Sequence, residues 1–197
     1  MATLETVLAE TQRIGLIGPG DLDEAIAQAR RFVASLPAGP LQVVDVGSGG
    51  GLPGLVIAVD RPDVALTMVD RRGRATDALR RALVALGIGS QARVVKTDVE
   101  AVARDPEWRA SFDVATARGL GAPSMVAELV IPLLRPGGRL IVSALGEGER
   151  WPDEGLAWVG AHVVSRTNGF VVVEAGECPT RFPRARKRVA LFDLPHP

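Results

Sequence analysis

The sequence has a single cysteine, no net charge and no long hydrophobic run, and each of these absences excludes a class of protein. Cys178 has no partner for an intrachain disulfide or a cysteine-built metal site, so a reducing compartment, the cytoplasm, is expected. Lys and Arg total 23, as do Asp and Glu, so any nucleic acid must be held by a local patch of charge. Charges interrupt every apolar stretch before about 18 residues accumulate, and Glu5 and Glu10 stand where a signal peptide would be basic, so neither a membrane span nor a signal peptide is expected.

Length and composition indicate one compact globular unit. The 197 residues leave no room for a second substrate domain, and a hydrophobic content of 47% suffices to bury a core. The 22 glycines and 14 prolines indicate many turns without the excess that is typical of disorder. We expect a monomer without a metal site.

Two amphipathic helices are predicted before the first strand. Leu4, Val7 and Leu8 recur at helical spacing, and the glycines of residues 15–20 end this first helix. Asp21, with Glu24 three residues later, forms a capping-box pattern, and the apolar face that follows predicts a second helix that ends before Pro37. Residues 1–38 are therefore expected to form N-terminal helices.

Residues 39–143 alternate between β and α patterns, which is typical of a parallel sheet with helices on both faces. The helical patterns occupy residues 55–59, 75–86, a short stretch at 101–102, and 123–134. The β patterns occupy residues 41–46, 65–70, 92–96, 112–117 and 139–143. We therefore predict a Rossmann-like α/β fold with a mostly parallel sheet of about six or seven strands.

The C-terminal part is harder to assign. Residues 151–159 have a helical pattern, whereas 162–164, 170–173 and 189–192 have β patterns. We expect two of these three β segments to form a final hairpin, and the pattern leaves open which two.

Polar and glycine residues follow the predicted parallel strands, at the end of the sheet where ligands of such folds bind. A glycine loop, Gly47–Gly54, follows the first strand, Asp70 ends the second and Arg118 follows the fourth. Glycines let backbone N–H groups approach a ligand closely at the start of a helix, although they also serve plain close packing. A carboxylate at Asp70, 23 residues after Gly47, can accept both hydroxyls of a ribose. The pair of features predicts a nucleoside cofactor.

The residue at position 45 helps to decide which kind of nucleoside cofactor the glycine loop would bind. Gly49, Gly51 and Gly54 match the dinucleotide fingerprint, which makes an NAD-dependent oxidoreductase an alternative. However, Asp45 stands where an NAD-binding strand usually carries an apolar side chain, and a carboxylate suits a cationic ligand. The acidic residue followed by two spaced glycines resembles motif I of class I S-adenosylmethionine methyltransferases, whose cofactor carries an ammonium and a sulfonium charge.

A narrower resemblance rests on two segments. Residues 45–54 (DVGSGGGLPG) and 112–118 (FDVATAR) resemble the glucose-inhibited division protein B family, which methylates a guanine at N7 in small-subunit (16S) ribosomal RNA, and residues 13–19 (RIGLIGP) are similar to its segment before the core. The resemblance implies that residues 39–197 form an S-adenosylmethionine-dependent methyltransferase domain, with Val99 and Glu100 framing the adenine. Together with the ends of the strands it predicts these cofactor-binding residues: Asp45, Gly47, Ser48, Gly49, Gly51, Leu52, Asp70, Asp98, Val99, Glu100 and Arg118.

The implied reaction needs no general base, because guanine N7 has a free lone pair and alignment of donor and acceptor supplies most of the acceleration. Arg118 is the candidate catalytic residue, which would position the acceptor or the cofactor. The alternative is a structural role, in which Arg118 forms an ion pair at the end of its strand. The Arg-His pair that the family carries before the first strand is replaced by residues 24–29, and the lysine after the fifth strand is absent from residues 144–146. A diverged paralogue that methylates a small molecule or another RNA, and a cofactor-binding regulator without catalysis, therefore remain alternatives.

The expected partner is ribosomal RNA or the small ribosomal subunit. The candidate RNA-binding residues surround Phe182, a candidate stacking surface: Arg181, Arg184, Arg186, Lys187 and Arg188. A second basic cluster, Arg71, Arg72 and Arg74, follows the second strand. The alternative for both clusters is a solvated charged face.

Overall fold

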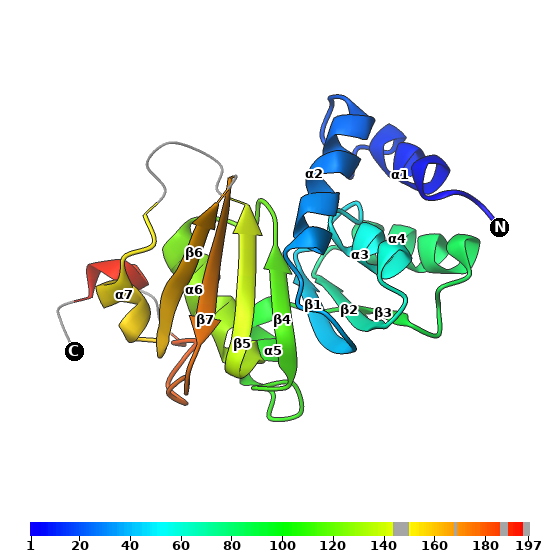
Figure 1. Cartoon of the computed structure of the whole chain (residues 1–197). Helices are drawn as coiled ribbons and strands as arrows, with labels where there is room; N and C mark the ends of the chain where they lie inside the picture. Colours follow the sequence, from blue (N-terminus) through cyan, green and yellow to red (C-terminus); the bar gives the residue numbers. More distant parts are fainter. Residues whose placement is uncertain (144–149, 168, 186–188, 195–197) are drawn as a thin grey trace. The chain divides into compact units, whose positions relative to one another are not determined.

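The computed structural model describes residues 1–143, 150–167, 169–185 and 189–194, and the chain divides into two compact units, Met1–Asp98 and Val99–Pro197 (Figure 1). Each unit combines strands with helices. The division at residues 38 and 39 that the sequence suggests stays a prediction.

The first unit begins with the two predicted helices, α1 (Leu4–Arg13) and α2 (Leu22–Ala34). The Asp21 carboxylate accepts hydrogen bonds from the backbone N–H groups of Asp23 (2.8 Å) and Glu24 (3.3 Å), so it caps α2 as predicted. Leu8 of α1 and Ala29 and Phe32 of α2 are completely buried, and Leu4, Val7 and Ile26 beside them are nearly so. The amphipathic pattern therefore marks the packed face of each helix.

Three parallel strands form the centre of this unit in the order β3-β2-β1, namely β1 (Leu41–Val46), β2 (Val64–Asp70) and β3 (Ala92–Lys96). Helices α3 (Gly54–Asp60) and α4 (Gly73–Leu86) connect them, and α4 ends at Gly87, whose φ of 70° is the left-handed helix stop that the sequence predicts. Val46 lies opposite Val69, and Asp70 lies opposite Lys96. This register places the carboxyl ends of the three strands at one edge.

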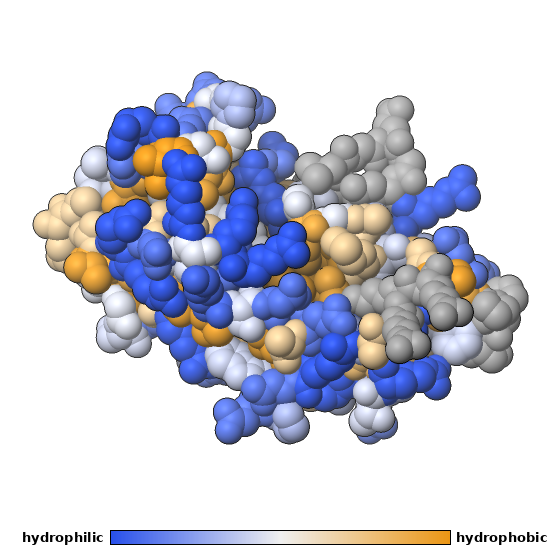
Figure 2. Space-filling model, turned by 180° about the vertical axis from the view of Figure 1, so that it is seen from behind, coloured by the Kyte–Doolittle hydropathy of each residue, from blue (hydrophilic) through white to orange (hydrophobic). Residues whose placement is uncertain are grey.

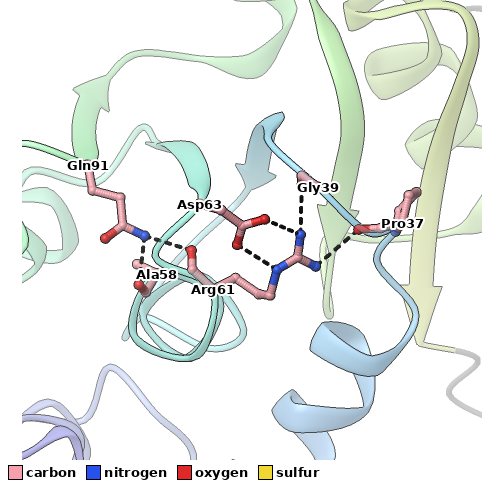
Figure 3. Close-up of polar contacts among 6 residues, drawn as sticks. All are labelled: Pro37, Gly39, Ala58, Arg61, Asp63 and Gln91. Atoms are coloured by element: carbon pink, nitrogen blue, oxygen red, sulfur yellow. Dashed lines mark hydrogen bonds and ion pairs between the residues drawn. The ribbon is translucent and has the colours of Figure 1, made fainter.

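A polar cluster fixes the opposite, amino ends of these strands (Figure 3). The Arg61 guanidinium donates to the carbonyls of Pro37 (3.1 Å) and Gly39 (2.8 Å), just before β1, and pairs with Asp63 (2.8 Å), just before β2. The Gln91 amide donates to the carbonyls of Ala58 and Arg61. Arg61, Asp63 and Gln91 therefore hold together the chain segments at this end of the three strands.

The second unit holds four strands in the order β4-β5-β7-β6, with α5 (Val99–Arg104) and α6 (Pro123–Val130) behind them in Figure 1 and α7 (Asp153–Ala157) after β5. Strand β4 (Phe112–Ala117) pairs in parallel with β5 (Leu134–Ser143). Strands β6 (Ala161–Thr167) and β7 (Phe170–Ala175) form the antiparallel hairpin, with β7 beside β5. The third candidate segment is no strand, because Leu191–Asp193 is a 3-10 turn.

The two largest boundary differences from the prediction in this unit lie at the end of α6 and at the start of β5, where a proline and a glycine explain them. The helix predicted over 123–134 changes at Ile131 into a 3-10 turn, since Pro132 has no N–H for the next helical bond. Strand β5 begins at Leu134 rather than at Arg139, and its register against β4 shifts across the intervening residues. A Cβ on Gly138 would lie 2.8 Å from the Arg135 carbonyl oxygen, so only glycine fits this irregular crossing.

The buried side chains are mostly apolar. Val43, Val44 and Val46 of β1 have no exposed surface. On the face shown in Figure 2, hydrophilic residues predominate and the hydrophobic ones form small areas among them. Within the described ranges, no helix combines the length and the apolar character that crossing a membrane requires.

Candidate functional site

The glycine loop turns tightly between β1 and α3. Gly47, Gly49 and Gly51 have φ values of 72°, 55° and 104°, in the left-handed region that favours glycine. The backbone N–H of Gly47 donates to the carbonyl of Val69 (2.8 Å), which ties the loop to β2. The Ser48 hydroxyl donates to the Asp45 carbonyl (2.8 Å), and the Gly51 N–H donates to the Ser48 carbonyl (2.8 Å). These bonds hold the loop at the carboxyl edge, where the sequence places it.

Asp45 lies under this loop and is almost completely buried, with 1% of its surface exposed. A Cβ on Gly54, the first residue of α3, would lie 2.7 Å from the Asp45 Oδ2 atom and 3.0 Å from the Met68 sulfur. The carboxylate therefore lies against the start of α3, and the close approach requires glycine at position 54. A buried carboxyl group thus lies directly beneath the loop.

Asp70 joins the end of β2 to the loop. Its carboxylate is 5% exposed and accepts hydrogen bonds from the Gly49 backbone N–H (2.9 Å) and from the Arg72 backbone N–H (2.9 Å). The Arg72 side chain adds two more, from Nε to Oδ1 and from Nη2 to Oδ2, both 3.1 Å. Burial alone would raise the pKa of Asp70, but the bonds from Arg72 and Gly49 outweigh it and hold this pKa below its ordinary value. Asp70 is therefore ionised at neutral pH.

The linker between α1 and α2 also touches the loop, which the pattern analysis does not predict. A Cβ on Gly50 would lie 2.9 Å from the Leu16 carbonyl oxygen and would overlap the Ile17 side chain. The Thr11 carbonyl accepts the N–H of Leu16 (2.9 Å), which turns the linker back toward the loop. The signal in the sequence was the likeness of residues 13–19 to the family's segment before the core.

The remaining predicted cofactor residues fall in both units. Leu52 is buried in the loop, and Asp98, half exposed, lies 4.0 Å from the Arg71 guanidinium. Val99 and Glu100 begin α5, where Glu100 pairs with Arg104 at 2.6 Å. Arg118 follows β4 directly and is half-buried. The structure thus gathers Asp45, the glycine loop and Asp70 within the first unit, whereas a role of Val99, Glu100 and Arg118 toward the same ligand stays a prediction.

Two residues of the C-terminal basic cluster, Arg181 and Arg184, lie within the described part of the chain, and they differ in their surroundings. Arg184 forms a two-pronged ion pair with the carboxylate of Glu128, which is 2% exposed, and its own side chain is 18% exposed. Phe182 is 1% exposed, so the prediction of a stacking surface for bases is wrong there. Arg181 is exposed and lies 5.4 Å from the centre of the Trp158 ring. Arg186, Lys187 and Arg188 lie outside the described residues.

The second basic cluster has partners as well. Arg72 binds Asp70, Arg71 faces Asp98, and Arg74 donates to the Ile14 carbonyl. Two of these three contacts stabilise the surroundings of the glycine loop. Groups of three or more His, Cys, Asp or Glu side chains that could hold a metal ion do not occur in the described part of the chain.

Arg109 has a structural role that local sequence does not reveal. Its guanidinium donates to the backbone carbonyls of Phe182 (2.7 Å), Cys178 (2.8 Å) and Pro179 (3.0 Å), and more weakly to that of Ala103 (3.3 Å). One side chain thereby anchors the segment after β7 to the region of α5. We call this arrangement the Arg109 anchor.

Comparison with known proteins gives the family. A family model described as rRNA small subunit methyltransferase G, GidB, matches residues 4–149. Ribosomal RNA small subunit methyltransferase G of Synechococcus sp. (strain CC9902) is 38% identical, in an alignment that covers 94% of this chain and 85% of that protein. The protein of the same name from Synechococcus sp. (strain RCC307) is 36% identical, with 74% and 68% covered. Other proteins of this name are matched over smaller shares of their own length, such as 63% and 39%.

Solved structures agree at the level of the fold. An O-methyltransferase family protein from Burkholderia thailandensis superposes with a TM-score of 0.60 at 16% identity, covering 79% of this chain and 58% of that one. At this identity the likeness speaks for the fold alone, and it confirms the predicted Rossmann-like class I methyltransferase fold. Because the family match spans most of the chain, from residue 4 to residue 149, the protein belongs to the GidB family of small-subunit rRNA methyltransferases, as the resemblance predicted.

Proposed function

We propose that this chain transfers a methyl group from S-adenosylmethionine to N7 of a guanine in small-subunit ribosomal RNA. The family match over residues 4–149 carries the substrate, and the buried Asp70 carboxylate, held against the glycine loop by the Gly49 N–H, supports the cofactor. Ribosomal RNA as the substrate implies a location in the cytoplasm. A single cysteine agrees with such a reducing compartment.

The residues of the first unit suit this cofactor chemically. A buried carboxylate at Asp45 would attract the ammonium group of the cofactor, and Asp70 would accept hydrogen bonds from its ribose. The close approach between Gly54 and Asp45 and the left-handed backbone of Gly49 and Gly51 make a loop without side-chain bulk. The donor set therefore fits a cationic nucleoside better than a dinucleotide, whose pyrophosphate a buried carboxylate would repel.

When bound, S-adenosylmethionine supplies a methyl group on a positively charged sulfur, which is already activated for displacement. The chain would contribute alignment: Asp45, the loop and Asp70 hold the donor, and Val99 and Glu100 frame the adenine. Arg118 would orient the acceptor or the cofactor. No residue needs to remove a proton, because guanine N7 attacks with a free lone pair.

RNA would be held by local charge. Arg181 is the described cation of the C-terminal cluster that is exposed, and Arg186, Lys187 and Arg188 remain part of the proposal. Arg184 is better explained as the partner of Glu128, because removing one member of a buried ion pair is strongly destabilising.

Calorimetric titration with S-adenosylhomocysteine tests the cofactor. We expect micromolar binding, weaker by about tenfold or more in Asp70→Ala, because the variant loses charged hydrogen bonds to the ribose. Asp77→Ala is the matched control, since this exposed carboxylate of α4 pairs only with Arg80 in the described contacts. Binding of NADH without S-adenosylhomocysteine would overturn the proposal in favour of an oxidoreductase.

Incubation with labelled S-adenosylmethionine and deproteinised small ribosomal subunits tests the acceptor. Labelling of the RNA, mapped to N7 of a guanine, is the expected outcome. Cofactor binding without labelling would contradict the proposed substrate and favour a small-molecule acceptor or a regulator.

A further inference from the structure

The Asp70 carboxylate has no acceptor capacity left in this structure. Oδ1 accepts from the backbone N–H and the Nε atom of Arg72, and Oδ2 accepts from the Gly49 N–H and the Nη2 atom of Arg72. A carboxylate offers about four lone-pair positions. A ligand that donates hydrogen bonds to Asp70 must therefore displace a donor that is already there.

The four donors fall into two kinds. The N–H groups of Gly49 and Arg72 belong to the backbone of the glycine loop and of the residue that precedes α4, so they cannot leave without local unfolding. The Arg72 guanidinium belongs to a side chain that is 57% exposed, on a flexible stem, and it can rotate into water. Only these two bonds are exchangeable.

The geometry of the exchange matches a ribose. A guanidinium presents two parallel N–H donors to a carboxylate, and a vicinal diol presents two O–H donors to the same pair of oxygens. The guanidinium also lies beside the loop, because a Cβ on Gly49 would lie 3.3 Å from its Nη2 atom. It therefore occupies the approach that a nucleoside would take to Asp70.

We infer that Arg72 is a specificity-determining competitor for the ribose site: its guanidinium occupies Asp70 in the free protein and leaves when a nucleoside with a free 2′,3′-diol binds. This inference rests on the proposed function and deepens it. A ligand without the diol gains nothing by displacing Arg72, because it would leave two positions of a buried carboxylate empty. Arg72 thus lowers the affinity for the diol ligand while it keeps Asp70 satisfied between turnovers.

Substitution of Arg72 tests the competition in binding, apart from activity. We expect Arg72→Ala to bind adenosine and S-adenosylhomocysteine about 3- to 10-fold more tightly, the range that follows from losing an exposed, two-pronged ion pair. Arg80→Ala, which removes the same charge from α4 away from the loop, should leave both affinities unchanged. Arg72→Lys, which keeps the charge but not the fork, should lie between wild type and the alanine variant.

The diol dependence distinguishes exchange from a general charge effect. For 2′,3′-dideoxyadenosine, measured by competition, Arg72→Ala should show no gain. An equal gain for both nucleosides, or a weaker affinity for adenosine in the variant, would overturn the inference. If S-adenosylhomocysteine binds neither wild type nor variant, the proposed function fails instead.

The dependence of adenosine affinity on ionic strength is a second test of the competition. Salt weakens the exposed Arg72 contact more than it affects a neutral nucleoside. The affinity of the wild type for adenosine should therefore rise between about 0.05 and 0.5 M NaCl, whereas that of Arg72→Ala should stay flat. Parallel salt curves for the two proteins would contradict the competition.

Discussion

At the residue scale, Asp70 shows how a buried carboxylate stays ionised beside a ligand loop. Its surroundings remove it from water, which favours the neutral form, and its hydrogen bonds from Arg72 and Gly49 favour the charged form more strongly. Its pKa therefore lies below its unfolded value of about 3.9. The same contacts that prepare the site also contribute to stability.

This balance makes a prediction about pH. Because the folded pKa of Asp70 is depressed, its stabilising contribution is fully present above the unfolded pKa and is lost as the pH falls through the folded pKa. We expect Asp70→Asn to be less stable than wild type by about 1 kcal/mol at pH 7, with a difference that shrinks below about pH 4. Urea unfolding of both proteins between pH 3 and about 7 measures it.

Asp77→Asn is the control, because this carboxylate is exposed and pairs with Arg80 on the same helix. A gap between wild type and Asp70→Asn that widens as the solution is acidified would contradict this account of Asp70.

At the scale of elements, the segment after β7, residues 176–185, has no helix or strand hydrogen bonds of its own, and side chains from other elements hold it in place. The Arg109 anchor satisfies the carbonyls of Cys178, Pro179 and Phe182, and the Glu128–Arg184 pair holds the next residues. Charged donors to backbone carbonyls substitute here for the ladder bonds of a strand. The tethering residues come from the loop after α5 and from α6, far away in sequence.

Removing the anchor should loosen this segment. We expect Arg109→Ala to lose about 2–3 kcal/mol of unfolding free energy, because several half-buried carbonyls lose their donor. Hydrogen exchange in residues 176–185 should accelerate more than in β4 and β5. Arg139→Ala, which breaks the longer, half-exposed pair with Glu174 (3.4 Å), should cost only about 0–1 kcal/mol. Equal losses in the two variants would show that Arg109 is no anchor.

At the scale of the whole molecule, the balanced charge determines how RNA can be attracted. With 23 cations and 23 anions, the chain has no net field, so association depends on a few local cations. Among the described arginines of the two basic clusters, Arg71, Arg72, Arg74 and Arg184 are paired with carboxylates or carbonyls. RNA contact should therefore be concentrated in few side chains.

Arg181 allows a test of this point. We expect Arg181→Ala to weaken RNA binding about 2- to 5-fold at low salt and to reduce the slope of log affinity against log salt by about 1, if the side chain contacts one phosphate. Filter binding at several salt concentrations measures both quantities. Arg139→Ala provides the charge-matched control, and an unchanged slope in Arg181→Ala would place the RNA elsewhere.

Much of the fold was predictable because it depends on local spacing. The limits of β1, β3 and β4 agree with the sequence, since each is a short apolar run bounded by turn residues or charges. The strand predicted at 189–192 was wrong. Val189 and Leu191 alternate as in a strand, but no neighbouring strand of the described residues pairs with them, and a 3-10 turn forms instead. The predicted end of α6 was wrong because the helical spacing of apolar residues continues past Pro132, whereas the helical hydrogen bonding of the backbone stops there.

The sequence by itself determined the alternation of strands and helices, the glycine loop and the carboxylate at the end of β2, because these follow from residue types at short, regular spacing. Only the tertiary structure decided which partner each charge takes. Arg184 and Phe182 belong to a basic stretch whose composition predicts an exposed surface. In the structure Arg184 pairs with Glu128, 56 residues away, and Phe182 is buried. Such pairings depend on which distant segments pack together. The charges and their spacing along the chain do not reveal which segments these are.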